Sequence, residues 1–320
     1  MNFRLGYVAM TLSLENCSPS GTVTYAVYSR LKDESARKIR LERVARQNLE
    51  NTLRILKYNR ALNIKVYRLT SKIIPLATHS ELAGWDYCRQ FERELRQLGD
   101  YIKENDFRIS AHPDHFTILN PVKAEVLKAS INDLDYHVKL FEAMGLEDYR
   151  YKLVLHVGGL YGDKYGSLER FKENYEKLPL RIKGRIIVEN DDKCFTASDV
   201  LKLCREIGTP MVLDVHHHIC ANNGERLSEL LPGIFDTWSG EPFPPKIHFS
   251  SPKSPKEFRS HADYIEYDGF MDFLHLAKKL GRDMDIMLEA KMKDKALLEL
   301  SQRLNSEKGL VRLDNATFTI

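Results

Sequence analysis

The sequence predicts a (β/α)8 barrel, or TIM barrel, formed as a single domain over residues 1–320. Short apolar segments alternate with longer charged, amphipathic segments eight times along the chain, which is typical of βα units. No low-complexity linker or shift in composition divides the chain, and α/β barrels reach this length undivided. Because a count of βα units does not establish closure, an open doubly wound sheet is the alternative.

Eight segments have the short apolar character of buried strands. They are residues 3–10, 64–70, 108–112, 152–158, 185–190, 210–216, 246–251 and 285–290. Helical patterns lie between them, the longest at 36–59, 85–105 and 121–145, the last with a proline suited to a first turn and a glycine suited to a C-terminal stop. The segment "SPSGTVTYAVYS" after the first strand predicts an irregular excursion before the next helix.

Composition indicates a soluble protein with a substantial core. Hydrophobic residues make up 43% of the chain and charged residues 29%, and the net charge is +3, from 48 basic and 45 acidic residues. The charge argues against an unstructured basic tail but leaves room for a local basic groove. Five scattered cysteines without a CxxC pair argue against a disulfide framework or a structural zinc cluster.

The start "MNFRLGYVAM" is too short and polar for a signal peptide, and no apolar run is long enough to span a bilayer. We therefore expect a cytoplasmic protein without a membrane partner.

Six successive strands deliver a histidine or a carboxylate near their C-terminal ends, where barrel enzymes carry their catalytic groups. These residues are His112, His156, Glu189, Asp214, His248 and Glu289. Strand alternation lets the apolar residue two positions earlier face the interior as well, as Val154 does below His156.

For any one of these residues, the ordinary interpretation is a hydrogen-bonded rim residue or a helix cap. The set is different, because three converging carboxylates repel one another unless cations neutralise them. Imidazoles among carboxylates form the mixed nitrogen and oxygen ligand set that Zn²⁺ or Mn²⁺ favours. The six positions therefore predict a polynuclear metal site.

The segment "VLDVHHHICAN" (212–222) runs from Asp214 into three histidines. Strict alternation favours His216 or His218 as inward-facing, but the chain leaves the strand here and spacing no longer chooses among the three. Those that do not bind metal could orient those that do.

Lys246 lies two residues before His248 and should also face inward, where divalent cations would repel an ammonium group. It must be neutral, be modified to an anionic carbamate, or reach an anionic substrate. The alternative is a lysine at the lower rim that extends its charge to water.

Eight ordered blocks of sequence give this chain a specific resemblance. They are "LGYV", "PLATH", "HP" after the third strand, "LHVGG", "ENDDK", "DVHHH", "KIHFSSPKS" with "RSHADY", and "EAKMKDKAL". In this order and almost end to end, they resemble the UV damage endonuclease family of DNA repair enzymes.

The resemblance implies a TIM barrel with up to three divalent metal ions, Mn²⁺ first, with Zn²⁺ or Mg²⁺ as alternatives. It implies three ligand sets: His112, His156 and Glu189 for one metal; Glu189, Asp214, His248 and Glu289 for a second; His217 and His261 for a third. Catalytic roles carry over to Glu189, to Lys246 as a carboxylated lysine, and to His79 near the metals.

The implied reaction is a nick immediately 5′ to a cyclobutane pyrimidine dimer or a 6-4 photoproduct, leaving a 3′-hydroxyl and a 5′-phosphate, with abasic sites as further substrates. Lesions weaken stacking, so extruding them costs less than extruding normal bases. Where the family has a Gln-aromatic wedge, this chain has His115 and Phe116. Tyr7 matches a residue that stacks on a lesion base, or else fills a barrel layer, and Thr11 replaces a common asparagine.

Residues 250–261 gather polar and basic groups beside the seventh strand, among them Ser250, Lys253 and Arg259. They suit contacts with phosphate, or they form an ordinary solvated loop. The expected partner is damaged double-stranded DNA, bound by a monomer in a nucleoid-associated activity. A sugar isomerase or epimerase with a closed pocket is one alternative. A nucleic-acid-binding barrel without catalysis is another, but it would require broken ligand positions, and none is broken here.

Overall fold

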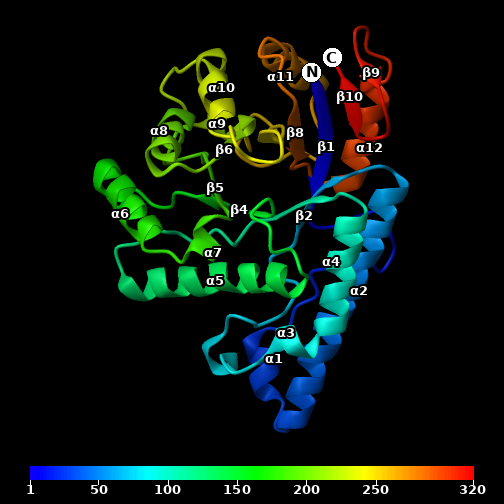
Figure 1. Cartoon of the computed structure of the whole chain (residues 1–320), viewed down its shortest axis with the longest axis vertical. Coiled ribbons are helices and arrows are strands. Elements are labelled where there is room, and N and C mark those ends of the chain that lie inside the picture. Colours follow the sequence, from blue (N-terminus) through cyan, green and yellow to red (C-terminus); the bar gives the residue numbers. More distant parts are fainter.

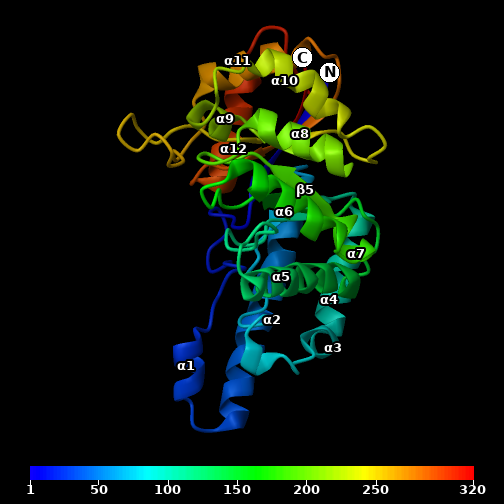
Figure 2. The same ribbon diagram turned by 90° about the vertical axis from the view of Figure 1, so that its left-hand side faces the viewer.

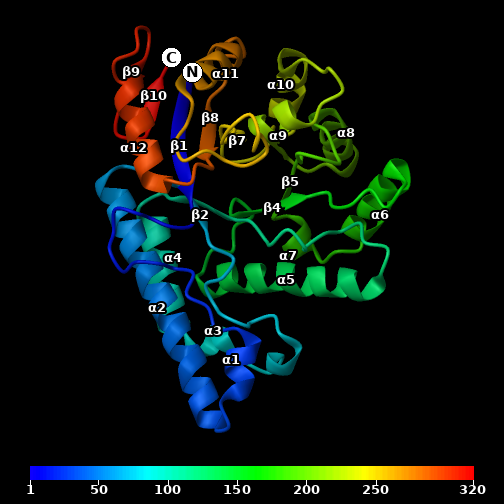
Figure 3. The ribbon, with the colours of Figure 1, turned by 180° about the vertical axis from the view of Figure 1, so that it is seen from behind.

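The computed structural model describes residues 1–320 and forms a closed barrel of eight parallel strands enclosed by helices (Figures 1 and 3). The strands are β1 (Asn2–Val8), β2 (Val66–Leu69), β3 (Arg108–Ala111), β4 (Lys152–His156), β5 (Ile186–Glu189), β6 (Met211–Asp214), β7 (Lys246–Phe249) and β8 (Met284–Leu288). Each pairs with the next, and β1 pairs with both β8 and β2. The pairing of β1 with β2 closes the barrel and confirms the TIM fold.

β1 joins three neighbours because it is longer than most of the strands. Its C-terminal half pairs with β2 at Gly6 and Val66, whereas its N-terminal half pairs antiparallel with β10 (Thr317–Thr319). A further strand, β9 (Val311–Arg312), continues this edge. A Cβ atom at Gly6 would lie 2.3 Å from the Val66 carbonyl oxygen, so glycine permits the close approach that closes the barrel. The sequence did not predict β9 and β10.

The helices lie mainly outside the barrel. They are α1 (Tyr25–Arg30), α2 (Glu34–Ala61), α3 (Tyr87–Gln90), α4 (Glu92–Glu104), α5 (Ala124–Ala143), α6 (Lys164–Glu176), α7 (Leu180–Lys183), α8 (Ala197–Ile207), α9 (Val215–Cys220), α10 (Leu227–Asp236), α11 (Tyr267–Lys278) and α12 (Lys293–Leu304), with a 3-10 helix η1 at Ser80–Leu82. No helix combines the length and apolar character that a bilayer crossing needs.

The helix boundaries depart from the predicted ones at three places. The 85–105 pattern divides into α3 and α4, because the chain turns at Phe91. Pro121 precedes α5 instead of forming its first turn, whereas Gly145 follows the helix with a φ of +70°, as a C-terminal stop does. The excursion after β1 contains the short helix α1, which Figure 2 shows beside the start of α2, away from the barrel.

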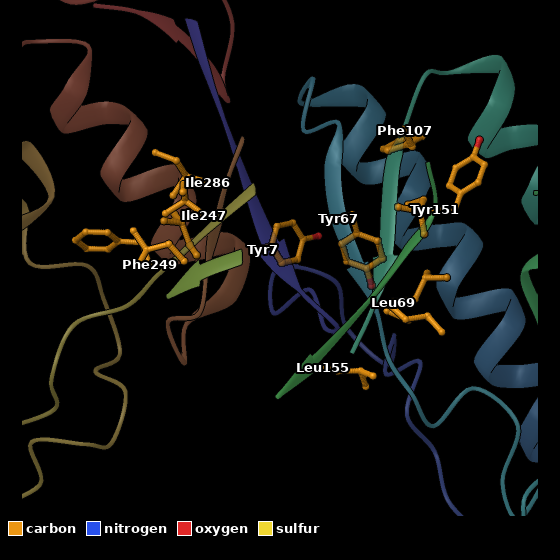
Figure 4. Close-up of a cluster of buried hydrophobic side chains, with 14 of the residues drawn as sticks. Tyr7, Tyr67, Leu69, Phe107, Tyr151, Leu155, Ile247, Phe249 and Ile286 are labelled. Carbon is orange, nitrogen blue, oxygen red and sulfur yellow. The ribbon is translucent and has the colours of Figure 1, made fainter. Parts of the chain in front are cut away.

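The main core lies between the barrel and its helices. One cluster of 69 buried residues runs from Phe3 to Phe318 and includes the edge-on pair Tyr7 and Tyr67, whose ring centres lie 5.4 Å apart (Figure 4). Burying such a side chain contributes roughly 1.5–3 kcal/mol. This layer fixes the strands whose ends carry the polar residues.

The barrel interior is separate from that core and is layered. Val154, Ile187 and Val212 pack with Trp238 inside it. Each of these three aliphatic residues lies two positions before the polar residue that ends its strand. Another interior layer carries a buried ion pair, in which Arg108 Nη1 lies 2.6 Å from an Asp285 carboxylate oxygen. The predicted inward alternation is therefore present, and it positions the polar residues at the C-terminal mouth.

Candidate metal centre

Glu189, at the end of β5, is the centre of the polar cluster. Three groups of side chains could each hold a metal ion, and all three include this carboxylate. The groups are His112, His156 and Glu189; Glu189, Asp214 and His217; and Glu189, His248 and Glu289, with the ligand atoms of each group within 4.8 Å of one another. Glu189 is therefore the one residue common to all three potential metal-binding groups.

The imidazoles of three strands surround the Glu189 carboxylate, which is almost fully buried. His112 Nε2 lies 3.2 Å from Glu189 Oε2, and His156 Nε2 lies 3.8 Å from the same oxygen. On the other side, His248 Nδ1 lies 2.8 Å from Glu189 Oε1. Closure of the barrel brings these groups together, since β3, β5 and β7 are not neighbours in the sheet.

The histidine triplet lies on a helix and not on a strand. β6 ends at Asp214, whose carboxylate caps α9 by accepting the backbone N–H of His217 at 2.8 Å. The third residue of this turn, His217, therefore comes back over Asp214, with Nδ1 3.7 Å from its Oδ2. Strand alternation favoured His216 or His218 and was wrong here because the chain changes period from two to 3.6 at Asp214.

Asn190 orients both members of this pair, a role that the sequence did not predict. Its side chain bonds both backbone groups of Asp214, accepting its N–H at 2.9 Å and donating to its carbonyl at 3.0 Å. Its own carbonyl accepts the Nδ1–H of His217 at 2.9 Å. This bond fixes the orientation of the His217 ring beside Asp214 and Glu189. The available signal was the position of Asn190, directly after Glu189 in "ENDDK".

The third group joins β7, β8 and the loop beyond β7. His248 Nδ1 lies 3.3 Å from Glu289 Oε1, and His261 donates its Nδ1–H to the Glu289 carbonyl at 2.8 Å. The rings of His217 and His261 lie 6.4 Å apart between centres. His217 therefore lies near Asp214 and Glu189, whereas His261 contacts Glu289, and a metal site shared by these two histidines stays a prediction.

The electrostatics of the cluster reflect its unbalanced charges. Burial, together with the nearby Glu189 and Glu289, raises the pKa of Asp214 well above its usual range. Burial opposes protonation of His217, but Asp214 and Glu189 outweigh it and raise the pKa of this imidazole to about 9. Burial lowers the pKa of His156 to about 4. Burial would raise the pKa of Glu189, but His248 and His156 outweigh it and hold this pKa well below its usual range, so Asp214 is the carboxylate whose charge the imidazoles compensate least.

An unpaired carboxylate oxygen supports a fit to metal ions. Asp214 Oδ2 is buried without a hydrogen-bond partner, whereas the unpaired nitrogens of His156 and His248 are not the ones nearest Glu189. His112 donates Nδ1–H to the Pro113 carbonyl at 2.9 Å, and its Nε2 lies 3.2 Å from Glu189 Oε2. A cation beside Asp214 Oδ2 would replace the repulsion among the carboxylates with coordination bonds and satisfy this oxygen.

Lys246 faces the interior one layer below His248 and is buried. Its Nζ donates to Ser110 Oγ at 2.6 Å. Burial, with Arg108 and Arg68 nearby, holds its pKa well below the usual lysine range. Of the three states that the sequence left open, this environment favours a neutral amine over an ammonium group, and the lower-rim alternative does not apply to a fully enclosed side chain.

His79 is not brought to the three groups. Its ring stacks on Tyr25, with 4.2 Å between ring centres, and its Nδ1 accepts the Glu81 N–H at 3.3 Å. Its neighbours thus come from α1 and η1. His79 belongs to none of the three potential metal-binding groups, and its catalytic role stays a prediction.

Tyr7 and Thr11 are buried. Tyr7 points outward from the barrel toward α2, where its hydroxyl bonds Thr11 and Asn59. This position corrects the interpretation of Tyr7 as a filler of the barrel interior, because odd-numbered residues of β1 face the helices. Neither side chain is open to a base in this structure.

His115 and Phe116 lie at the surface after β3, with Phe116 53% exposed and the two rings in an edge-on contact. Across the mouth, Ser250 is buried, whereas Lys253 pairs with Glu257 and Arg259 pairs with Asp192. Lys253 and Arg259 therefore already have acidic partners. Phe116 is an expected DNA-contacting residue with an exposed aromatic ring.

The chain matches the family described as UV-endonuclease UvdE over residues 3–318. A UV DNA damage endonuclease of Bacillus thuringiensis subsp. konkukian is 45% identical over 317 residues, covering 99% of both chains, and one of Bacillus mycoides is equally similar. The crystal structure of SacUVDE superposes with a TM-score of 0.84 at 35% identity, covering 95% of this chain and 98% of that one. The chain therefore belongs to the UV-endonuclease family.

Proposed function

We propose that this protein is a metal-dependent DNA repair endonuclease that nicks one strand immediately 5′ to cyclobutane pyrimidine dimers and 6-4 photoproducts, leaving a 3′-hydroxyl and a 5′-phosphate. Abasic sites are proposed as further substrates, and the active form as a monomer. Membership of the family supports a DNA repair endonuclease. The observation that carries the proposal is the Glu189 carboxylate shared by three potential metal-binding groups.

The protein's own residues would hold two or three divalent ions, Mn²⁺ first. His112 and His156 would hold one ion with Glu189, and the groups around Asp214 and Glu289 would hold the others. Such ions supply Lewis-acid polarisation of a phosphodiester and activation of water. The buried carboxylates keep these positions fixed, and Asn190 keeps the imidazole of His217 correctly turned.

Damage selectivity would come from the exposed residues after β3. An exposed aromatic ring such as Phe116 can stack on a base or enter a weakened base step, and His115 can donate a hydrogen bond beside it. A photoproduct lowers the cost of extruding the damaged bases, so a wedge of modest strength discriminates damaged from intact DNA. Lys246, enclosed below the cluster, would support ligand positions either as a neutral amine or as a carbamate.

The decisive experiment incubates the purified protein with UV-irradiated and untreated supercoiled plasmid, with MnCl₂ and with chelator. We expect nicking only of the irradiated plasmid, and only when MnCl₂ is present. Primer-extension mapping should place the nick directly 5′ to pyrimidine pairs. Equal nicking of both plasmids, or full activity in chelator, would refute the proposal.

A further inference from the structure

The loop after β4 carries an exposed aromatic ring at the barrel mouth. β4 ends at His156, which belongs to a potential metal-binding group, and Tyr161 follows in the loop beyond it. Tyr161 is 48% exposed. Phe116, the exposed ring proposed as the wedge, lies in the neighbouring loop after β3. The mouth therefore presents aromatic rings from two adjacent strands.

The loops after β3 and β4 are bonded to each other. The Asn120 side chain donates to the Gly159 carbonyl at 2.9 Å. Gly158 has a φ of +119° and permits this close approach, because a Cβ atom there would lie 2.2 Å from Asn120 Oδ1. The backbone segments that carry Tyr161 and Phe116 are therefore connected directly, and not only through the barrel.

The backbone of Tyr161 is strained. Its φ is +49°, in the left-handed region that a bulky side chain rarely adopts. The preceding carbonyl, that of Leu160, accepts the Ser167 hydroxyl at 2.7 Å and the Asp163 N–H at 2.9 Å, and these bonds hold the turn in place. Strain that persists in this way is often associated with a binding site. Glycine would adopt the same conformation without strain, so the turn itself does not explain the aromatic side chain.

Arg170 of α6 fixes the direction of the Tyr161 ring. Its guanidinium lies over the ring, 5.5 Å from the ring centre, as in a cation–π contact. The same guanidinium donates Nε–H to the Asn120 carbonyl at 3.2 Å and Nη2–H to the Ser167 hydroxyl at 2.8 Å. The ring is thus oriented before a ligand arrives, which lowers the entropy cost of binding.

A second tyrosine shows which of these features are particular to Tyr161. Tyr149 is 47% exposed, and the guanidinium of Arg185 lies 5.8 Å from its ring centre. Tyr149 precedes β4, at the opposite end of the barrel, and its φ is not positive. Exposure and a guanidinium over the ring are therefore common to both tyrosines, whereas the strained backbone and the place at the mouth belong to Tyr161.

We propose that Tyr161 is a second lesion-recognition residue, whose ring stacks on a base that the damaged duplex leaves unstacked. Stacking on an aromatic ring accepts any base, which suits an enzyme that acts beside lesions in any sequence. Bases of intact DNA remain stacked on one another, so the contact becomes available where a lesion has weakened the stack. The inference rests on the proposed function and names a further residue by which that site selects its substrate.

The test compares Tyr161→Ala with Tyr149→Ala, a matched control of the same residue type and almost the same exposure. Fluorescence anisotropy in chelator measures affinity for a short duplex with one cyclobutane dimer and for the intact duplex, over a series of NaCl concentrations. A second measurement places 2-aminopurine, a base whose fluorescence responds to stacking, at single positions opposite and beside the dimer. Tyr161→Phe and Tyr161→Gly complete the set.

Tyr161→Ala should weaken binding to the damaged duplex by at least about 5-fold, the loss expected for one base stack, and weaken binding to the intact duplex less. The slope of log affinity against log salt should stay the same, because no phosphate contact is removed. Tyr149→Ala should match the unaltered protein, and Tyr161→Phe should retain the affinity because it keeps the ring. One 2-aminopurine position should change its fluorescence on binding to the unaltered protein and respond differently to Tyr161→Ala.

Tyr161→Gly separates the ring from the backbone. It should lose affinity as Tyr161→Ala does, yet unfold at a higher temperature than Tyr161→Ala, because glycine relieves the strain at positive φ.

Unchanged affinity of Tyr161→Ala for the damaged duplex, or an equal loss in Tyr149→Ala, would overturn the stacking role while nicking by the unaltered protein leaves the proposed function standing. A 2-aminopurine response identical at every position in Tyr161→Ala and the unaltered protein would do the same. Failure of the unaltered protein to bind or nick the damaged duplex would overturn both.

Discussion

The carboxylate of Glu189 in β5 lies 2.8 Å from Nδ1 of His248 in β7, across the barrel mouth and over the intervening strand β6. On its other side the same carboxylate meets His112 of the β3 end at 3.2 Å. One buried acid therefore connects ligands on both sides of the rim. This arrangement makes Glu189 the position where a single substitution should disturb most of the centre.

Glu189→Gln should abolish nicking of UV-irradiated plasmid, with a fall in rate of more than about 100-fold. Loss of a residue that only hydrogen-bonds to a metal ligand lowers metal affinity or activity by about 10- to 100-fold, and loss of a ligand itself should cost more. The fold should persist, since the core between barrel and helices does not include this residue. Nicking assays and circular dichroism check both. Glu173→Gln, on the exposed surface of α6, is the control, and retained activity in Glu189→Gln would contradict the bridging role.

Metal affinity should rise with pH up to about 9. Asp214 and Glu189 raise the pKa of His217 to about 9, so the metal-free imidazole carries a proton at neutral pH that a metal must displace. Below that pH, affinity at this group should gain about tenfold per pH unit, and above it the gain from His217 should end. Calorimetric titration with MnCl₂ measures the dependence. In His217→Gln the dependence should weaken, and an unchanged profile would argue against metal binding by His217.

Phe116→Ala should reduce the preference for damaged DNA while leaving Mn²⁺ affinity unchanged. The ring is 53% exposed and belongs to none of the potential metal-binding groups, so its loss should change the free energy of unfolding by less than about 0.5 kcal/mol. Competition between irradiated and intact duplex measures the preference. Phe116→Trp, which keeps an aromatic face, should retain it; equal discrimination by the alanine variant would remove Phe116 from the wedge.

Asp285→Ala should destabilise the protein by about 3–5 kcal/mol, because it leaves the buried Arg108 guanidinium without its counter-ion. Arg4, whose guanidinium lies 2.6 Å from the same carboxylate, loses its partner too. Urea denaturation measures the change. The exposed Asp272→Ala on α11 should remain near the original stability, and a similar value for Asp285→Ala would show that the interior pair contributes little.

Acid should weaken the same contact. Arg108 and Arg4 oppose the effect of burial and hold the pKa of Asp285 below its usual range. A carboxyl with a lowered folded-state pKa contributes stability at pH values above its unfolded pKa, and this contribution is lost as pH falls through the folded value. The unaltered protein should therefore lose more stability than an Asp285→Asn variant when the pH is lowered below about 4.

The sequence by itself determined the barrel and most of the rim. Alternation within each strand is local, so the inward direction of His156 and Glu189 followed from the apolar residue two positions before each. The resemblance to the family indicated His217 and His261 as further metal ligands, which residue spacing alone could not identify. Strand alternation no longer predicted side-chain direction beyond Asp214. The chain changes there from strand to helix, and His217 is the histidine that lies beside the Asp214 carboxylate.

Only the tertiary structure decided which side chains meet. The pairing of His248 with Glu289, the orientation of His217 by Asn190, and the ion pair of Arg68 with Glu289 depend on the closure and stagger of strands far apart in the chain. The tertiary structure also showed that the face of β1 carrying Tyr7 packs against α2, and that His79 stacks on Tyr25 of α1. Distances across a barrel are set by all eight strands together, so no single stretch of sequence contains them.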